Sequence, residues 1–278
     1  MEKTLVTSAT LAERLNDPQW IIFDCRFSLV DSEKGRRLYE HAHIPGALYA
    51  DLNQDLSGPI TADSGRHPLP SVTMLSHKLS EWGVTASTQV VVYDDCYGAM
   101  AARMWWLLRW LGHGAVALLD GGLQQWQQEQ RPLDQQLAQP ISGQFLAKPN
   151  DDAWVDTSFI EQNLQTTQYC LFDARTEARF QGIEEPIDKL AGHIPGAINM
   201  PFSYNLDNDG QFLPSGTLQR AYQEKMATTP AAQVILMCGS GVTACHGLLA
   251  MEHAGLVGAK LYVGSWSEWI TDPQRPIA

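Results

Sequence analysis

The chain of 278 residues has only five cysteines, and no two of them are spaced as CxxC. This odd, scattered set indicates neither a disulfide framework nor a structural zinc site. Lysine and arginine together number 19 against 31 acidic residues, and the net charge of -12 argues against nucleic acid or an anionic membrane surface as a partner. No apolar run approaches the roughly 18 residues of a membrane span, and the N-terminal MEKTLVTSATLAERL has no apolar signal core. We therefore expect a cytoplasmic protein without membrane association.

Segments of the first half recur in the second half, in the same order and about 143 to 150 residues further along. This repetition predicts a duplicated domain: an N-terminal domain at 1–131, a polar linker at 132–153 and a C-terminal domain at 154–278. The matching pairs are IIFDCRFS (21–28) with CLFDARTE (170–177), HAHIPGALYADL (41–52) with AGHIPGAINMPF (191–202), QVVVYDD (89–95) with QVILMCG (233–239), and LDGGLQQW (119–126) with YVGSWSEW (262–269).

Short apolar runs alternate with runs of helical periodicity in each half, which predicts an α/β fold. Because the strands are apolar throughout, each domain is expected to be a mainly parallel sheet covered by helices on both faces. In the second half we predict strands near 169–173, 233–237 and 260–263 and helices near 156–163, 217–227 and 242–254. In the first half, a strand at 90–93 and a helix at 99–111 repeat the last strand–helix pair.

A cysteine follows the predicted strand 233–237 in the stretch LMCGSGVTACHGL, at the sheet edge where ligands of such folds bind. Nucleophilic chemistry needs a thiolate, and the free N–H groups and positive end of a helix stabilise an anion there. Glycines let the chain turn tightly so that several N–H groups converge on one point, while hydroxyl groups add donors. The predicted anion cradle is the loop 238–243, formed by Cys238, Gly239, Ser240, Gly241, Val242 and Thr243.

The other cysteines are expected to be small buried hydrophobic residues. Cys25 and Cys170 lie in or beside predicted strands, and Cys245 lies within a predicted helix. Cys96 lies in the first half's equivalent loop, YDDCYGAM, in which Asp94 occupies the position of Cys238. An acid there should repel an anionic substrate, so the first domain is expected to be catalytically silent.

Two other cysteine chemistries fit the sequence less well. A cysteine-dependent phosphatase needs an arginine six residues after the cysteine, and this position is Ala244. A papain-like mechanism needs a histidine paired with the cysteine, and His246 is expected to point away on the same helix.

The repeated Asp-x-Arg and His-Ile-Pro-Gly-Ala motifs, together with a single Cys-Gly-Ser-Gly-Val-Thr loop, resemble the two-domain rhodanese-type sulfurtransferases. The resemblance covers nearly the whole chain. It implies that Cys238 accepts a sulfane sulfur as a persulfide and passes it to a thiol (thioredoxin-like or small) or to cyanide, with no metal or organic cofactor. It also implies an active site in the second domain that faces the first. A sulfur-relay module that acts only with a partner protein remains the alternative.

The loop composition bears on the donor, a small anionic sulfur compound. Thiosulfate rhodaneses carry arginine and lysine where this chain has Gly239 and Ser240, and the neutral loop is similar to that of 3-mercaptopyruvate sulfurtransferases. The resemblance assigns Arg179, in EARFQG, to the donor's anionic group, which a planar guanidinium can bind through two hydrogen bonds. The first expected donor is 3-mercaptopyruvate, and thiosulfate is the alternative.

The chain departs from the mercaptopyruvate pattern after Arg179. That subfamily has a second arginine about nine residues later, where this chain reads EEPIDKLAGH and places Ile187 and Asp188. Lys189 is the candidate substitute. Arg175 and Asp173, by contrast, are expected to brace the fold, since Asp24 and Arg26 repeat the pair in the silent half.

The resemblance also implies that the first half contributes to the substrate site. His67, in GRHPLP, matches a histidine that the subfamily places near the loop serine with an aspartate, for which either Asp51 or Asn53 could align. Arg66 beside it would add positive charge to a site shared by both domains and would favour thiosulfate.

Overall fold

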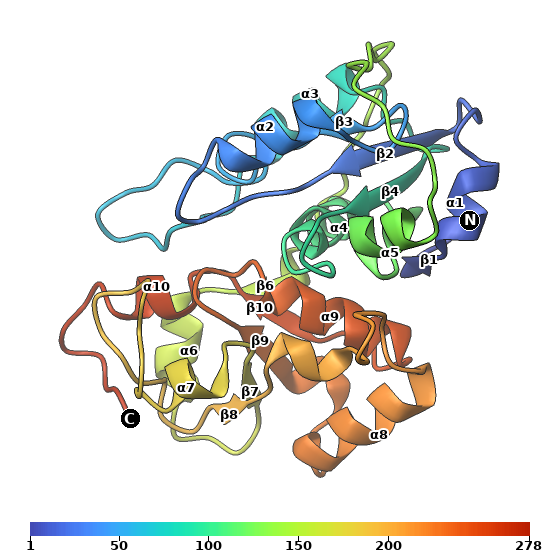
Figure 1. Ribbon diagram of the computed structural model, residues 1–278. Helices are drawn as coiled ribbons and strands as arrows, with labels where there is room; N and C mark the ends of the chain where they lie inside the picture. Colours follow the sequence, from blue (N-terminus) through green and yellow to red (C-terminus); the bar gives the residue numbers. More distant parts are fainter. The chain divides into compact units, whose positions relative to one another are not determined.

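Each half of the chain forms a five-stranded sheet in the computed structural model, which describes residues 1–278 (Figure 1). The strand orders are β1-β5-β4-β2-β3 and β6-β10-β9-β7-β8, so the second sheet repeats the topology of the first. Every pair of neighbouring strands is parallel. The predicted fold class, two tandem α/β domains with parallel sheets, is confirmed.

The chain divides into two compact units that do not follow the midpoint of the sequence. Unit 1 comprises residues 1–58, 70–150 and 209–211, and unit 2 comprises residues 59–69, 151–208 and 212–278. Most of the segment predicted as a linker packs within unit 1, where Asp134 forms an antiparallel bridge with His43 and the Lys148 N–H donates to the Leu111 carbonyl at 2.8 Å. More important for function, residues 59–69 from the first half of the sequence are part of unit 2.

The helices and strands alternate along both units, as the periodicity predicts. None of the helices has the length and apolar character needed to cross a membrane. The elements of unit 1 are β1 (Leu5–Val6), α1 (Ser8–Glu13), β2 (Trp20–Asp24), α2 (Lys34–His41), β3 (Leu48–Tyr49), α3 (Val72–Glu81), β4 (Gln89–Tyr93), α4 (Ala101–Trp110), β5 (Val116–Leu119) and α5 (Gly122–Gln128).

Unit 2 repeats this order and adds three short 3-10 helices at Asp151–Ala153, Phe202–Asn205 and Ala231–Gln233. The predicted strands and helices of this half are all present, with ends shifted by one or two residues. They are β6 (Trp154–Val155), α6 (Thr157–Asn163), β7 (Cys170–Asp173), α7 (Glu177–Phe180), β8 (Ile198–Asn199), α8 (Ser215–Met226), β9 (Val234–Met237), α9 (Ala244–His253), β10 (Lys260–Tyr262) and α10 (Ser265–Trp269).

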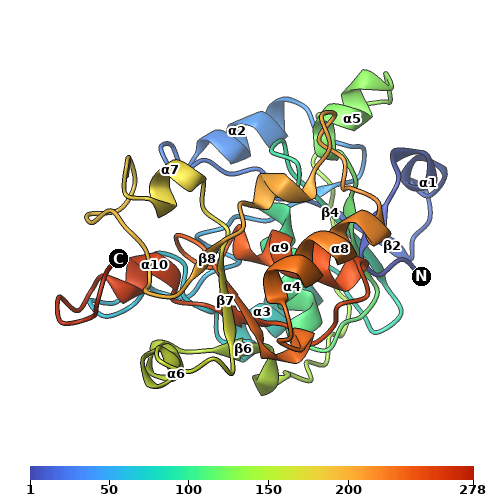
Figure 2. The same cartoon turned by 90° about the horizontal axis from the view of Figure 1, so that it is seen from below.

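The sheet of unit 2 is covered on both faces. Alternate residues of β9 face opposite ways, so Ile235 and Met237 join a core with Trp266 and Trp269 of α10, and Leu236 contacts α9 at Gly247. On this second face, the ring of Phe172 in β7 also packs edge-on against Tyr222 of α8 at 6.0 Å. Figures 1 and 2 accordingly show α6 and α10 on one side of β7, and α8 and α9 on the other. This arrangement buries the central strand β9 and leaves its carboxyl end as a fixed point for the following loop.

A buried aspartate–arginine pair braces the end of a strand in each unit. Arg175 donates from Nη2 to Asp173 at 2.7 Å and to the Gly192 carbonyl at 2.8 Å, and its side chain is 1% exposed. Arg26 repeats this arrangement with Asp24 and the Ala42 carbonyl, at 2.6 and 2.7 Å. The same contacts in both units support a structural role for the pair.

We expect Arg26→Met to lower the free energy of unfolding by about 3–5 kcal/mol, because it leaves the Asp24 carboxylate buried without its counter-ion. Chemical denaturation followed by tryptophan fluorescence measures the change. The control is Arg37→Met, which removes an exposed ion pair with Asp31 and should change the unfolding midpoint little. Equal midpoint shifts in the two variants would contradict the bracing role.

Candidate active site

Cys238 follows β9 directly and is buried, with 2% of its surface exposed. The turn that begins α10 holds its loop in place from the outside: the Trp266 N–H donates to the Cys238 carbonyl at 3.0 Å, and the Ser267 N–H donates to the Gly239 carbonyl at 2.9 Å. A helix start thus fixes the backbone on which the cysteine sits.

Ser265 is a positioning residue that the sequence analysis missed. It is fully buried and has a left-handed backbone with φ of 53°, which is strained for a residue with a side chain. Its Oγ accepts the Cys238 N–H at 3.1 Å and donates to the Tyr262 carbonyl at 2.9 Å. The repeat contained the signal: Ser265 aligns with Gly122, whose φ of 60° shows that this position requires a left-handed residue.

Gly241 combines a left-handed conformation with an environment that leaves no room for a β-carbon. Its φ is 73°, and a β-carbon placed there would lie 2.6 Å from the Val263 carbonyl oxygen. The equivalent residue of unit 1 is Tyr97, three positions after Asp94, and its φ is 58°. Both loops therefore make a left-handed turn at this position. The loop 238–243 therefore shares this turn with the equivalent loop of unit 1.

The equivalent loop of unit 1 holds a carboxylate. The Asp94 carboxylate accepts four backbone N–H groups: Oδ1 from Cys96 and Gly98 at 2.9 and 2.8 Å, and Oδ2 from Met100 and Ala101 at 2.8 Å each. Asp94 is thus itself the anion bound in the cradle of unit 1, an arrangement that is compatible with the expected repulsion of an anionic substrate. The equivalent position in unit 2 is Cys238, which places a sulfur where unit 1 places a carboxylate.

Of the remaining cysteines, Cys25, Cys170 and Cys245 are buried and Cys96 is half-buried. Burial raises the pKa of Cys170 to about 11 and, together with Asp24 and Asp94, holds the pKa of Cys25 well above its ordinary value. Burial and the Asp94 charge likewise raise the pKa of Cys96. Cys245 is fully buried one turn into α9, and its thiol donates to the Gly241 carbonyl at 3.3 Å. These contacts support packing roles for all four.

Ser240 forms a hydrogen bond with His67, whose Nδ1 lies 2.7 Å from the serine Oγ. Both side chains are buried, at 5% and 3% exposure. His67 reaches the loop because residues 59–69 belong to unit 2. The hypothesis from the sequence that His67 lies beside Ser240 therefore agrees with the geometry. Asp51, considered as a third member, instead caps its own turn in unit 1 by accepting the N–H groups of Asn53 and Gln54.

Two arginines lie over Gly239, the residue next to Cys238. A β-carbon at this position would be 2.9 Å from Arg66 Nη2 and 3.5 Å from Arg179 Nη2. Arg179 is oriented by Glu185, because its Nε–H donates to both carboxylate oxygens of Glu185 at 3.0 Å. Both arginines predicted from the sequence thus converge on the candidate loop.

Two carboxylates, which the sequence analysis did not assign to the site, neutralise this pair of arginines. Asp188 contacts Arg66 through Oδ1 and accepts Arg179 Nη2 through Oδ2 at 2.9 Å. Although burial opposes the charge of Glu185, the hydrogen bonds from Arg179 and from the Asp188 and Ile187 N–H groups hold its pKa below the ordinary value. Burial raises the pKa of Asp188, even though Arg66 and Arg179 favour its charged form. The position expected for a second arginine thus holds an acid.

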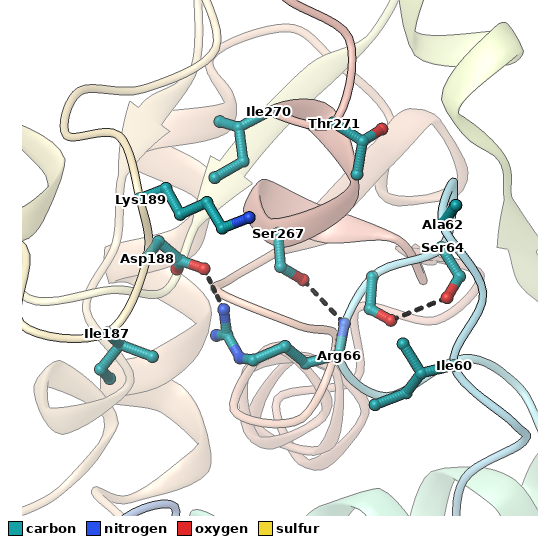
Figure 3. Close-up of a pocket in the computed structure, with 11 residues that line it drawn as sticks. Ile60, Ala62, Ser64, Arg66, Ile187, Asp188, Lys189, Ser267, Ile270 and Thr271 are labelled. Atoms are coloured by element: carbon teal, nitrogen blue, oxygen red, sulfur yellow. Dashed lines mark hydrogen bonds and ion pairs between the residues drawn. The ribbon is translucent and has the colours of Figure 1, made fainter.

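A pocket of about 390 Å³ opens beside the arginines, between the loop 59–69, the loop after α7 and α10 (Figure 3). Figure 3 shows Arg66 and Asp188 in contact on one side and Lys189 extending toward the space. Lys189, the expected substitute for the second arginine, therefore lines this pocket, while Asp188 contacts Arg179. The polar lining residues include Ser64, Arg66, Asp188, Lys189, Ser267 and Thr271.

His246 belongs to the core of unit 2. Its ring stacks on Phe212 with 4.4 Å between centroids, and its Nδ1 lies 3.2 Å from the amide nitrogen of Asn205. It is fully buried. These contacts give His246 a packing role and no place in a papain-like cysteine–histidine pair.

These features define a tandem α/β protein with one candidate cysteine nucleophile, set in a glycine-containing loop beside two arginines. The chain belongs to the rhodanese family: the model of the Rhodanese-like domain matches residues 7–129 and 156–272. This match covers both halves of the chain, as the internal repeat requires.

Similar proteins extend over nearly the full length. The probable 3-mercaptopyruvate sulfurtransferase of Pseudomonas aeruginosa is 46% identical over 99% of this chain and 97% of its own. The putative thiosulfate sulfurtransferase SseB of Mycobacterium tuberculosis is 37% identical over 99% of this chain and 96% of its own. Among solved structures, SseA from Escherichia coli, described under 3-mercaptopyruvate sulfotransferases, superposes with a TM-score of 0.82 at 31% identity and covers 96% of this chain and 100% of its own.

We expect Gly241→Ala to lower the thermal unfolding midpoint and the free energy of unfolding by about 1–3 kcal/mol, because alanine is strained at this φ and its methyl group would meet the Val263 carbonyl. The matched variant is Gly239→Ala, whose methyl group meets only the flexible ends of two arginines. It should unfold close to the wild type. A larger loss of stability for Gly239→Ala in scanning calorimetry would contradict this assignment.

Proposed function

We propose that the protein is a sulfurtransferase that moves a sulfane sulfur from 3-mercaptopyruvate to a thiol or cyanide through a persulfide on Cys238. The C-terminal domain, 154–278, supplies the reacting loop, and the N-terminal domain, 1–131, is catalytically silent apart from the segment that carries Arg66 and His67. The observation that carries the proposal is the hydrogen bond between Ser240 and His67. It lies next to Gly239, over which the guanidinium groups of Arg66 and Arg179 converge. The name of the Pseudomonas aeruginosa relative supports the same donor.

The first half-reaction forms a sulfur–sulfur bond. The Cys238 thiolate attacks the thiol sulfur of the donor, the carbon–sulfur bond breaks, and its electron pair leaves as the enolate of pyruvate. A proton then converts the enolate to pyruvate. We expect the N–H groups of the loop to donate to the terminal sulfur of the resulting persulfide and to stabilise its negative charge. In unit 1, N–H groups of the equivalent loop stabilise the Asp94 carboxylate in this way.

Ser240 and His67 suit the leaving group of this step. When His67 Nδ1 carries the proton, it donates to Ser240 Oγ, and the serine hydroxyl hydrogen is free to donate to the donor's carbonyl oxygen. Negative charge develops on this oxygen as the enolate forms, so the hydrogen bond strengthens in the transition state. The guanidinium of Arg179, with Arg66 beside it, binds the donor's carboxylate and orients the sulfur toward Cys238.

The second half-reaction returns the enzyme to its starting state. A thiolate or cyanide attacks the terminal sulfur, the sulfur–sulfur bond breaks, and Cys238 leaves as a thiolate. A small thiol or a thioredoxin-like protein thiol fits this role, and the split into two steps predicts ping-pong kinetics. We place the reaction in the cytoplasm, where a reducing environment would keep all five cysteines as free thiols.

Thiosulfate is the second candidate donor. Arg66 adds a cation close to Gly239, a feature that suits a dianion, and the Mycobacterium tuberculosis relative carries the name of a putative thiosulfate sulfurtransferase. Asp188 and Glu185 offset both arginines, however, so the site has no net positive charge in its present arrangement. This balance favours the monoanionic keto acid.

Steady-state kinetics with cyanide as acceptor tests the proposal. We expect kcat/KM for 3-mercaptopyruvate to exceed that for thiosulfate, and Cys238→Ser to lower both on the order of a thousand-fold or more, because the hydroxyl cannot store the sulfur. The control is Cys245→Ala, which removes the neighbouring buried thiol and should retain activity. Turnover by Cys238→Ser would refute the mechanism, and a preference for thiosulfate would reverse the choice of donor.

Ser240→Ala separates the two donors. It should lower kcat for 3-mercaptopyruvate by about 100-fold, since the enolate loses its hydrogen-bond donor. The thiosulfate reaction should fall by much less, because sulfite leaves without needing a proton. Parallel measurement of kcat for both donors provides the comparison, and an equal loss with each would show that Ser240 serves the loop structure rather than the leaving group.

A further inference from the structure

The Asp188 carboxylate occupies the space between the two arginines in the way that a bound anion would. Each of its oxygens contacts a different guanidinium, Oδ1 that of Arg66 and Oδ2 that of Arg179. The side chain is only 3% exposed. Asp188 thus forms the same kind of bridge as the donor carboxylate would form with these arginines.

The location of this bridge links Asp188 to the reacting loop. The guanidiniums that hold Asp188 are the ones that lie over Gly239, within 2.9 and 3.5 Å of the position a β-carbon would take there. Glu185 holds Arg179 at Nε and also at Nη2, where its Oε1 lies at 2.8 Å. Asp188 accepts a second hydrogen bond from the same Nη2 at 2.9 Å, so it takes up the donor that a ligand would otherwise use there. An anion that enters beside Cys238 therefore meets arginines whose charges are already balanced.

The two carboxylates are not equivalent. Glu185 is held by Arg179, by Arg175 at 3.5 Å and by the N–H groups of Ile187 and Asp188, and these contacts keep its pKa low. The Asp188 carboxylate is bound by the two arginines, Arg66 and Arg179, and burial raises its pKa. Of the pair, Asp188 has fewer hydrogen-bond partners, and its surroundings favour its charged form less.

We propose that Asp188 is a built-in competitor of the donor, a specificity-determining residue whose carboxylate must leave the Arg66–Arg179 bridge before the donor's anionic group can bind. The inference rests on the sulfurtransferase function proposed above. Asp188 remains close to the exchanged anion and repels it, and this repulsion is larger for a dianion than for a monoanion. The residue therefore weakens the binding of every donor and selects against thiosulfate.

Calorimetric titration of a protein that cannot turn over tests this directly. In a Cys238→Ser background, pyruvate serves as the monoanionic keto acid probe and thiosulfate as the dianionic probe. Asp188→Asn should lower the Kd for pyruvate by about fivefold, and the Kd for thiosulfate by more than this. Glu184→Gln is the matched control, since it removes the same charge from an exposed position in the same loop and should change either Kd by less than about twofold.

Unchanged or weaker binding in Asp188→Asn would overturn the proposal and would show that the carboxylate serves only to order the arginines. An equal gain in Glu184→Gln would also overturn it, because the effect would then be one of net charge. Asp188→Ser provides a second test if the asparagine variant is unstable in thermal unfolding, with the same expected direction.

The readout also separates this inference from the proposed function. The titrations need no turnover, so tighter anion binding in Asp188→Asn supports the competitor role even if the wild type fails to use 3-mercaptopyruvate. With Cys238 intact, the same substitution should lower KM for 3-mercaptopyruvate and change kcat little, since it alters binding and not the bond-breaking step. A loss of kcat at constant KM would contradict it.

Discussion

The convergence of backbone N–H groups on the first residue after the central strand is the constraint on which the rest depends. Such donors cannot be left buried without an acceptor, so this residue must present negative charge or a strong acceptor. Unit 1 meets the requirement with the Asp94 carboxylate and four hydrogen bonds. Unit 2 places Cys238 at the equivalent position, where the proposed function requires donors of the same kind to stabilise an anionic sulfur.

Local sequence patterns predict the fold and the candidate nucleophile, because both depend on residues that lie close together in the chain. Apolar strands, helix periodicity and the internal repeat are enough for two parallel sheets, and the glycine loop after β9 marks Cys238. The hydrogen bonds of Asp94 could not be predicted in this way. Its residue type indicates repulsion of anions, whereas its four hydrogen bonds depend on a backbone turn that only coordinates reveal.

The contacts around the arginines are harder to predict because they join segments far apart in the sequence. Asp188 bridges Arg66 and Arg179 across 122 and 9 residues, and nothing in EEPIDKLAGH indicates which of its acids points inward. Lys189 had the right charge for the expected arginine but lines the neighbouring pocket instead. Long-range pairing of charges, unlike helix or strand periodicity, leaves no local pattern.

The membership of residues 59–69 in unit 2 and of residues 209–211 in unit 1 has a consequence for the history of the protein. Gene duplication first produces two complete and separable copies. Here each unit is completed by a piece of the other half of the sequence, and the piece given to unit 2 carries a histidine and an arginine that its candidate site uses. After this exchange, neither half of the sequence contains all the residues of one unit. A gene that encoded one half alone would therefore no longer produce a complete unit.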